Sequence, residues 1–425
     1  IIIMPAQYDM NFRYDCLQEQ TSVSTKTYNR EGIEYKIFYL NKNAYENDDE
    51  NLISRGIFRS VILDSKDNVL SFGVPKSVSN KYFKEKFQEI STDLQVNEAV
   101  EGTMVNLFYD TRIESWEIST RTAISGNYWW TYKSPDRKPE PHEKIMQMTF
   151  RAMFLQTLGY NENTPFNDVI MFQSLPKDCI FSFVFQHPSN QIIVPVEYAR
   201  LYLVSVYKKF DSNLLELIPL SHVKLWSQFN IQNSVIHFPV DYSSQLNSYN
   251  EIYNYLAGMV YLHKGIMITD VQSGLRTCFV NSDYENMRKT VGNEKNQEYR
   301  MYLQYRYYVL KYAEQLQNYL VSFQMTHKHM FQQFEKEQMN LIYKIQERYR
   351  MKYDPVNRGK VYEFVEPRTY GEKAIPKHIE RLHKDFYIAA KARGEKRNIT
   401  KDVVNEYFNS LAPLEQWLAL QPIRK

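Results

Sequence analysis

This chain of 425 residues contains few cysteines and glycines, and its net charge is small. Its three cysteines, Cys16, Cys179 and Cys278, lie far apart, with neither a paired spacing nor a companion histidine cluster. This pattern argues against a disulfide framework and against a zinc site, and it fits a reducing, intracellular compartment. The formal net charge is only +3, so nucleic-acid binding would have to rest on a local basic patch.

Long apolar runs and repeats are missing as well. The opening Ile1–Met4 is apolar, but Gln7 and Asp9 follow at once, so it is too short for a signal peptide or a membrane span. We therefore expect no membrane partner. Hydrophobic residues make up 43% and charged residues 24%, an ordinary globular balance, and the length favours two or three domains.

The first two thirds of the chain, from Tyr35 to about Val280, are dominated by short β-type runs. These runs are β-branched or aromatic and end at Asn, Asp, Gly or Pro, as strands do. They cover 35–39, 56–63, 103–109, 179–185, 191–194 and 199–207. Helical patterns interrupt them only at 81–89 and 142–158. The sequence therefore predicts an α+β domain built on antiparallel sheets.

The last third has a different character. Residues 298–353 run almost without Gly or Pro, which predicts a helical domain. A break at 354–371 precedes two shorter helices, 377–391 and 400–411, the second with Thr400 as its N-cap. We therefore expect an N-terminal extension at 1–30, an α+β domain at 31–290 and an all-helical C-terminal domain at 291–425.

A tetrapeptide in the first domain connects the chain to known chemistry. In Ala99-Val100-Glu101-Gly102, the last two residues match a Lys-x-Asp/Glu-Gly motif, in which a lysine amine attacks the α-phosphate of a nucleotide. Before and after this tetrapeptide, further segments occur in the order found in one family of such enzymes, at 35–39, 54–58, 116–124, 183–193, 264–267 and 274–281. Over roughly residues 30–290 the chain thus resembles the bacteriophage-type RNA ligases of the nucleotidyltransferase superfamily. Residues 399–411 are similar to the C-terminal ends of giant-virus homologues, so we suspect a viral relative.

The departures from this family fall on the residues that carry its chemistry. Ala99 stands where the nucleophilic lysine is expected, Val184 and Lys264 replace glutamates, and no lysine remains of the pair that neutralises the triphosphate. That pair corresponds to Cys278 and Val280 or, one residue later, to Phe279 and Asn281. The resemblance implies a catalytically degenerate pocket, with ATP and Mg²⁺ as cofactors only if ligase activity persists; the sequence predicts no metal site.

Six residues remain as candidate remnants of the nucleotide pocket: Arg55, Glu101, Gly102, Arg121, Lys264 and Arg276. For Glu101 and Gly102, a tight turn is the simpler interpretation than nucleotide contact. Arg55 and Arg121 could hold a phosphate or pair with acidic neighbours. Lys264 could act as a substitute amine, but a solvated lysine at a strand end is favoured.

Basic and aromatic residues alternate in the helical domain, as in proteins that bind single-stranded RNA. The candidate RNA contacts are Arg300, Tyr305, Arg306, Lys311, Arg348, Arg350, Lys384 and Arg393. Packing of the tyrosines against the first domain is favoured over RNA binding. His378 and His383 are interpreted as surface groups and not as metal ligands.

The preferred hypothesis is a non-catalytic scaffold with an RNA ligase-like fold that binds RNA or a viral or host protein. The first alternative is an active RNA ligase or nucleotidyltransferase with rewired catalytic residues. The second is a structural component of a viral particle, which would present a flat apolar patch on the helical domain.

Overall fold

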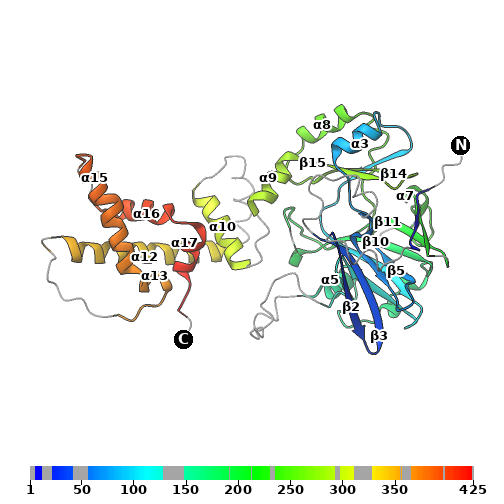
Figure 1. Ribbon diagram of the computed structural model, residues 1–425, viewed down its shortest axis with the longest axis horizontal. Coiled ribbons are helices and arrows are strands. Elements are labelled where there is room, and N and C mark those ends of the chain that lie inside the picture. Colours follow the sequence, from blue (N-terminus) through cyan, green and yellow to red (C-terminus); the bar gives the residue numbers. More distant parts are fainter. Residues whose placement is uncertain are drawn as a thin grey trace. The chain divides into compact units, whose positions relative to one another are not determined.

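The computed structural model describes residues 5–11, 22–41, 56–127, 148–190, 192–211, 213–229, 235–291, 297–310, 328–354, 356, 365–395 and 398–423. The chain divides into two compact units, residues 1–289 and 290–425 (Figure 1). The first combines antiparallel sheets with helices, and the second is helical apart from one isolated β-bridge. Within the described part of the chain, no helix is long and apolar enough to cross a membrane.

The largest sheet of the first unit has the strand order β1-β12-β11-β10-β7-β8-β9, and β13 pairs in parallel with β11. Its strands are β1 (Gln7–Asp9), β7 (Thr103–Asp110), β8 (Ser115–Thr120), β9 (Ala123–Ile124), β10 (Cys179–Gln186), β11 (Arg200–Lys209), β12 (Leu214–Ile218) and β13 (Ile236–His237). Alternate residues of the central strand enter different cores: Phe181 and Phe183 lie in one buried cluster and Ile180 in another. The sheet is therefore covered on both faces.

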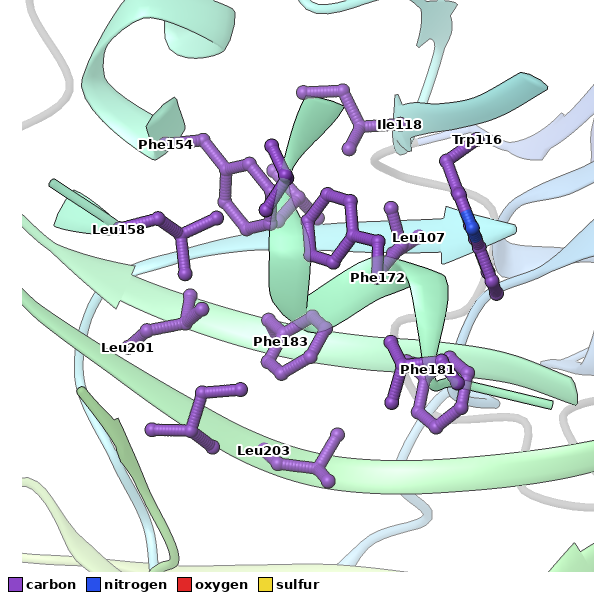
Figure 2. Close-up of a cluster of buried hydrophobic side chains, with 14 of the residues drawn as sticks. Leu107, Trp116, Ile118, Phe154, Leu158, Phe172, Phe181, Phe183, Leu201 and Leu203 are labelled. Atoms are coloured by element: carbon purple, nitrogen blue, oxygen red, sulfur yellow. The ribbon is translucent and has the colours of Figure 1, made fainter. Parts of the chain in front are cut away.

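Helices cover one face of this sheet. They are α5 (Phe150–Thr157), α6 (Ile170–Gln173) and α7 (Leu220–Val223), with 3₁₀ turns η2 (Phe166–Asp168) and η3 (Pro188–Asn190). Phe154 of α5 contacts Phe172 and Phe183, with ring centroids 6.3 and 6.0 Å apart (Figure 2). Aromatic packing of this kind fixes α5 on the sheet.

A four-stranded sheet, β2-β3-β4-β5, covers the opposite face. Its strands are β2 (Val23–Arg30), β3 (Ile33–Leu40), β4 (Val61–Leu63) and β5 (Val69–Phe72), and η1 (Gly56–Arg59) precedes β4. The shared core contains Phe38, Phe72 and Tyr207. This packing places the end of η1 close to β11.

A three-stranded sheet with the order β15-β14-β6 completes the first unit. It consists of β6 (Leu94–Glu98), β14 (Gly265–Asp270) and β15 (Arg276–Val280), with α3 (Asn80–Lys86), α8 (Tyr249–Ala257) and α9 (Ser282–Val291) nearby in sequence. Val96, Ile268 and Phe279 pack with residues of α3 and α8 on one face. The other face carries half-buried residues, among them Arg276 and Cys278 of β15, which form part of the candidate site described below.

The helical unit is built around α10 (Gln297–Val309) and the long α12 (Lys328–Tyr353). It continues with α13 (Tyr370–Lys373), α14 (Ile375–Arg381), the π-helix η5 (Leu382–Ile388), α15 (Ala389–Ala392), α16 (Lys401–Ser410) and α17 (Pro413–Leu420). Its core includes Tyr302, Phe334, Ile342 and Phe408. The Thr400 side chain accepts the Val403 backbone N–H, which confirms the predicted N-cap.

Four local expectations were wrong. Residues 56–63 form a 3₁₀ turn followed by β4. The backbone is not extended at Phe58, where φ is −82° and ψ is 23°, so the strand begins only at Val61. Among 191–194, the described residues 192–194 form a bend and not a strand, because the backbone amides of Ile193 and Val194 donate to a carboxylate. The segment 1–30, expected to be an extension, contributes β1 and β2. Of the predicted helix 142–158, residues 142–147 lie outside the described residues, and 148–149 are not helical, because Thr149 caps the helix that begins at Phe150.

Candidate phosphate-binding site

The loop 99–102 joins the three-stranded sheet to the largest sheet, between the end of β6 and the start of β7. Ala99 is buried, and its backbone N–H donates to the Gly265 carbonyl over 2.9 Å. This bond extends the β6–β14 pairing by one residue and fixes position 99 against the start of β14. A methyl group therefore occupies the place that the resemblance gives to a nucleophilic amine.

Glu101 is committed to the protein's own backbone. Its carboxylate accepts the N–H groups of Ile193 and Val194 over 3.0 and 2.8 Å, and the Tyr284 hydroxyl also hydrogen-bonds to it. Burial raises the pKa of Glu101, while these hydrogen bonds and the charge of Lys264 oppose the rise. Glu101 thus holds the 193–194 segment in place.

Gly102 permits a close approach of two strands. Its φ is +149°, and an added Cβ would lie 2.5 Å from the Phe185 carbonyl oxygen and 2.7 Å from Val184 Cγ1. A side chain at this position would therefore collide with β10. Together with the hydrogen bonds of Glu101, this contact supports the tight-turn interpretation for both residues.

Lys264 is not a solvated lysine at a strand end. Its side chain is half-buried, and Nζ donates to the Val100 carbonyl oxygen over 3.3 Å, directly after Ala99. Desolvation lowers the pKa of Lys264, the charges of Arg288 and Arg59 lower it further, and Cys278 and Glu101 act in the opposite direction. An amine therefore lies beside position 99, contributed by a different strand.

The two alignments that the sequence left open concern residues on different faces of β15. Thr277 and Phe279 are buried, whereas Arg276 and Cys278 are half-buried and alternate with them. Asn281 caps the loop before β14, with its amide donating to three carbonyls at 259, 260 and 263. Phe279 and Asn281 are thus structural, and Cys278 shares the half-buried face of the strand with Arg276.

Six cations gather around this face. They are Arg59 at the end of η1, Lys76 after β5, Arg121 between β8 and β9, Lys264, Arg276 and Arg288 of α9. Burial, followed by the charges of Arg276 and Arg121, lowers the pKa of Arg59 to about 10. Desolvation and the charges of Arg59, Arg121 and Arg288 likewise lower the pKa of Lys76. Segments far apart in sequence thus place mutually repelling charges close together.

None of these six cations lies within ion-pair distance of a carboxylate among the described residues. Lys76, Arg121 and Arg288 are exposed, whereas Arg59, Lys264 and Arg276 are half-buried. Arg276 Nε and the Tyr8 hydroxyl are both buried, and neither has a hydrogen-bond partner in the described part of the chain. Burial of an unpaired charge is costly, because the group loses its hydration without compensation. An anionic ligand would supply the missing compensation.

The same residues do not fit a divalent metal ion. Glu101 is the one carboxylate that acts on Lys264, and its oxygens already accept two backbone N–H groups. Across the described residues, no group of three His, Cys, Asp or Glu side chains is arranged to hold a metal. Mg²⁺ prefers oxygen ligands, whereas this site consists mainly of cations.

The remaining pocket candidates have different surroundings. Arg55 lies outside the described residues. Arg121 is exposed at the turn between β8 and β9, and it belongs to the cation group through its effect on Arg59 and Lys76. Arg59 and Arg288 were missed by sequence reasoning, and Lys76 is exposed. The resemblance directs attention to lysines on β15, whereas these charges come from other elements.

The RNA-binding candidates of the helical unit separate into buried and exposed groups. Tyr305 is buried against Phe331 and Phe334, so it packs in the core of its own unit. Arg306 is half-buried and donates to the Asn409 carbonyl, which leaves it poorly placed for a phosphate. Lys311 lies outside the described residues. Arg300 and Arg348 are half-buried, Arg350, Lys384 and Arg393 are exposed, and Arg393 pairs with Glu395.

His378 and His383 also differ from expectation. His378 is buried, and its Nδ1 lies 2.8 Å from the Tyr407 hydroxyl, because α14 packs its inner face against α16. His383 is half-buried, and its Nδ1 lies 2.9 Å from the Tyr349 hydroxyl. Neither is a freely solvated surface group.

No family model and no curated protein matches the sequence. Among solved structures, an archaeal ATP-dependent RNA ligase (form 2) is similar at 11% identity and a TM-score of 0.40, covering 94% of this chain and 99% of that one. Form 1 gives 12% identity, a TM-score of 0.37 and coverages of 95% and 91%. A mutant Naegleria gruberi RNA ligase with ATP and Mn gives 12% identity and a TM-score of 0.33, and the match covers 67% of this chain and 86% of that one. The chemistry available to this chain is therefore inferred from the geometry of its own site and not from this likeness.

Proposed function

We propose that this chain is a catalytically degenerate RNA ligase-like protein, which binds a phosphate-rich ligand without forming a covalent bond to position 99. The observation that carries the proposal is the group of unpaired cations around Lys264 and Arg276, next to a loop in which Ala99 replaces the reactive amine. The order of the sequence motifs supports the RNA ligase-like assignment. A viral source stays a prediction from the same resemblance.

The charge pattern favours a polyphosphate over a single phosphate. Six cations influence one another at this site, whereas a single phosphate carries at most about two negative charges, so several phosphates balance the positive charge better. Guanidinium groups form paired hydrogen bonds to phosphate oxygens, and each charge-assisted bond contributes about 1.5–3 kcal/mol. A nucleoside triphosphate or the 5′-triphosphate end of an RNA presents such a chain of anions.

Calorimetric titration of the full chain tests this proposal with inorganic tripolyphosphate, ATP and AMP. We expect tripolyphosphate and ATP to bind at least about tenfold more tightly than AMP, because AMP carries one phosphate. Affinity should fall as salt is raised, since charge attraction dominates. Equal affinity for AMP and ATP, or no binding of tripolyphosphate at low salt, would contradict the proposal.

A second candidate function, a rewired nucleotidyltransferase, is favoured by one observation: Lys264 Nζ lies 3.3 Å from the Val100 carbonyl oxygen. A lysine with a lowered pKa is more often neutral and thus a better nucleophile. An attack on the α-phosphorus of a nucleoside triphosphate would form a P–N bond and release pyrophosphate and one proton.

Incubation with α-labelled ATP and Mg²⁺ or Mn²⁺, followed by denaturing electrophoresis, separates the two candidates. We expect no labelled band, beside an active RNA ligase as positive control. A band that maps to Lys264 by mass spectrometry and disappears in Lys264→Arg, but not in Lys66→Arg at an exposed lysine, would replace the non-catalytic proposal with the enzyme.

A further inference from the structure

Three aromatic rings form a stack at the edge of the helical unit's hydrophobic core, against which Tyr353 packs. The His383 ring lies 3.8 Å from the Tyr353 ring at an interplanar angle of 1°, and 5.1 Å from the Tyr387 ring at 17°. Tyr353 ends α12, while His383 and Tyr387 lie four residues apart in η5. Two elements thus contribute to one column of rings.

This geometry differs from the packing of aromatic residues in the core of the same unit. There the pairs Tyr302–Phe334, Tyr305–Phe331 and Phe386–Tyr407 meet edge to face, at 83°, 78° and 88°. Within that core the pairs Tyr302–Tyr305 and Tyr305–Phe334 are tilted, at 40° and 45°. Offset parallel contacts also occur between protein rings, and they are the geometry in which nucleobases stack on aromatic side chains. The stack therefore orients its ring faces as a stacked nucleobase would need them.

Tyr349 contacts the stack at Tyr353 and His383, and Tyr387 at the other end is partly exposed. The Tyr349 hydroxyl lies 2.9 Å from His383 Nδ1, and the Tyr349 ring is 4.9 Å from that of Tyr353. Tyr387 is 37% exposed, and the neighbouring Ile388 is 49% exposed. Segments of π-helix such as η5 are uncommon and often accompany functional sites. The exposed ring is thus supported by rigid neighbours.

Charge around the stack is mixed but basic on balance. Lys352 Nζ lies 5.4 Å from the Tyr353 ring centre and 3.8 Å from Glu380, and Asp385 follows Lys384 in η5. Lys384 and Lys391 are exposed and form no ion pair with any described residue. Residues 290–425 contain 24 Lys and Arg against 16 Asp and Glu, whereas residues 1–289 contain 28 against 33. The helical unit therefore carries a net positive charge and the first unit a net negative one, so long-range attraction of a nucleic-acid backbone favours the helical unit.

We propose that the Tyr353–His383–Tyr387 stack is a binding platform for single-stranded nucleic acid, on which a base adds to the open face of Tyr387 while Lys384 and Lys391 meet the backbone phosphates. Stacking on aromatic rings tolerates every base, so the platform selects single strands and not a sequence. This site involves residues other than those of the phosphate-binding site, and either can exist without the other.

Fluorescence anisotropy of a 5′-labelled 12-nucleotide oligoadenylate tests the platform with the full chain at low salt. We expect Tyr387→Ala to weaken binding about 5- to 100-fold and Tyr387→Phe to change it by no more than about twofold, since the ring faces remain. Tyr343→Ala is the matched control, because Tyr343 is 60% exposed on α12 outside the stack; its affinity should equal that of the unmodified chain.

An abasic oligomer of equal length and charge separates stacking from simple charge attraction. The abasic oligomer should bind to the unmodified chain more weakly than oligoadenylate does. To Tyr387→Ala, the two oligomers should bind with equal affinity. Equal affinity for the two oligomers in the unmodified chain, or equal losses in Tyr387→Ala and Tyr343→Ala, would overturn the platform, as would no binding of either RNA or DNA. Tripolyphosphate binding should be unchanged in Tyr387→Ala, so a failure here is distinguishable from a failure of the phosphate-binding site.

Discussion

Replacement of Arg59 or Arg276 by methionine should weaken tripolyphosphate binding by about 10- to 100-fold, without loss of stability in the unliganded protein. The loss follows from the removal of a charge-assisted contact of about 1.5–3 kcal/mol. Both arginines are substantially desolvated, and burial lowers the pKa of each. Methionine has a similar length and carries no charge, so it fills the space without the repulsion.

The stability of the unliganded chain should rise, by about 1–3 kcal/mol for Arg59→Met. The reason is that the folded state holds the Arg59 charge less well than water does, as its lowered pKa of about 10 shows. Residues that stabilise the fold do not behave in this way, since their removal costs stability. Opposite signs for binding and stability are typical of residues kept for a ligand.

Urea unfolding and calorimetric titration of the same preparations measure the two effects. Arg200→Met is the control, because Arg200 is an exposed residue on β11 and should change neither quantity. A variant of Arg59 or Arg276 that unfolds more readily and binds tripolyphosphate normally would mean that these arginines are structural. The phosphate-binding proposal would then lose its main support.

The elements with a clear sequence pattern were predictable, and those set by tertiary contacts were not. Runs of β-branched and aromatic residues located β3, β7, β10 and β11 to within two residues at each end. Thr400 was found as an N-cap because capping depends on neighbours three residues away. In contrast, the bend at 192–194 depends on Glu101, about 90 positions earlier in the chain, and no local pattern encodes it.

The candidate site shows the same division. Position 99 and Lys264 could be located from motif order, since each motif is a short continuous segment. The direction of the Lys264 side chain could not be predicted, because it depends on the pairing of β14 with β6. That pairing places Nζ near Val100. Arg59 and Arg288 lie in segments without any recognised motif, so only the packing of η1 and α9 brings them to the site.

Buried tyrosines in α10 illustrate a third limit. Alternation of basic and aromatic residues is shared by RNA-binding surfaces and by helices that pack through one face. Sequence favoured packing for Tyr305, and its burial against Phe331 and Phe334 agrees, although the partner helix lies in the same unit. The stacked rings of Tyr353, His383 and Tyr387 had no sequence signal, because they come from separate elements.

Gly265→Ala should be among the most destabilising single substitutions in the first unit, at about 3 kcal/mol or more. Gly265 begins β14 with a φ of +153°, and an added Cβ would collide with the Phe279 carbonyl oxygen and lie 3.0 Å from Val280 Cα. Both are backbone atoms of β15, which cannot move without breaking the pairing between β14 and β15. The Gly265 carbonyl also accepts the Ala99 N–H, so the strain would reach the loop 99–102.

Thermal unfolding followed by circular dichroism at a wavelength sensitive to β-structure measures this effect, since the helical unit can unfold separately. Gly258→Ala is the matched control: Gly258 follows α8 with a φ of −87°, and an added Cβ would meet nothing closer than 3.7 Å. We expect Gly258→Ala to stay within about 1 kcal/mol of the unmodified chain. If Gly265→Ala were equally mild, β14 and β15 would be less closely paired than their register indicates, and the half-buried face that carries Arg276 and Cys278 would lose its fixed position beside the loop 99–102.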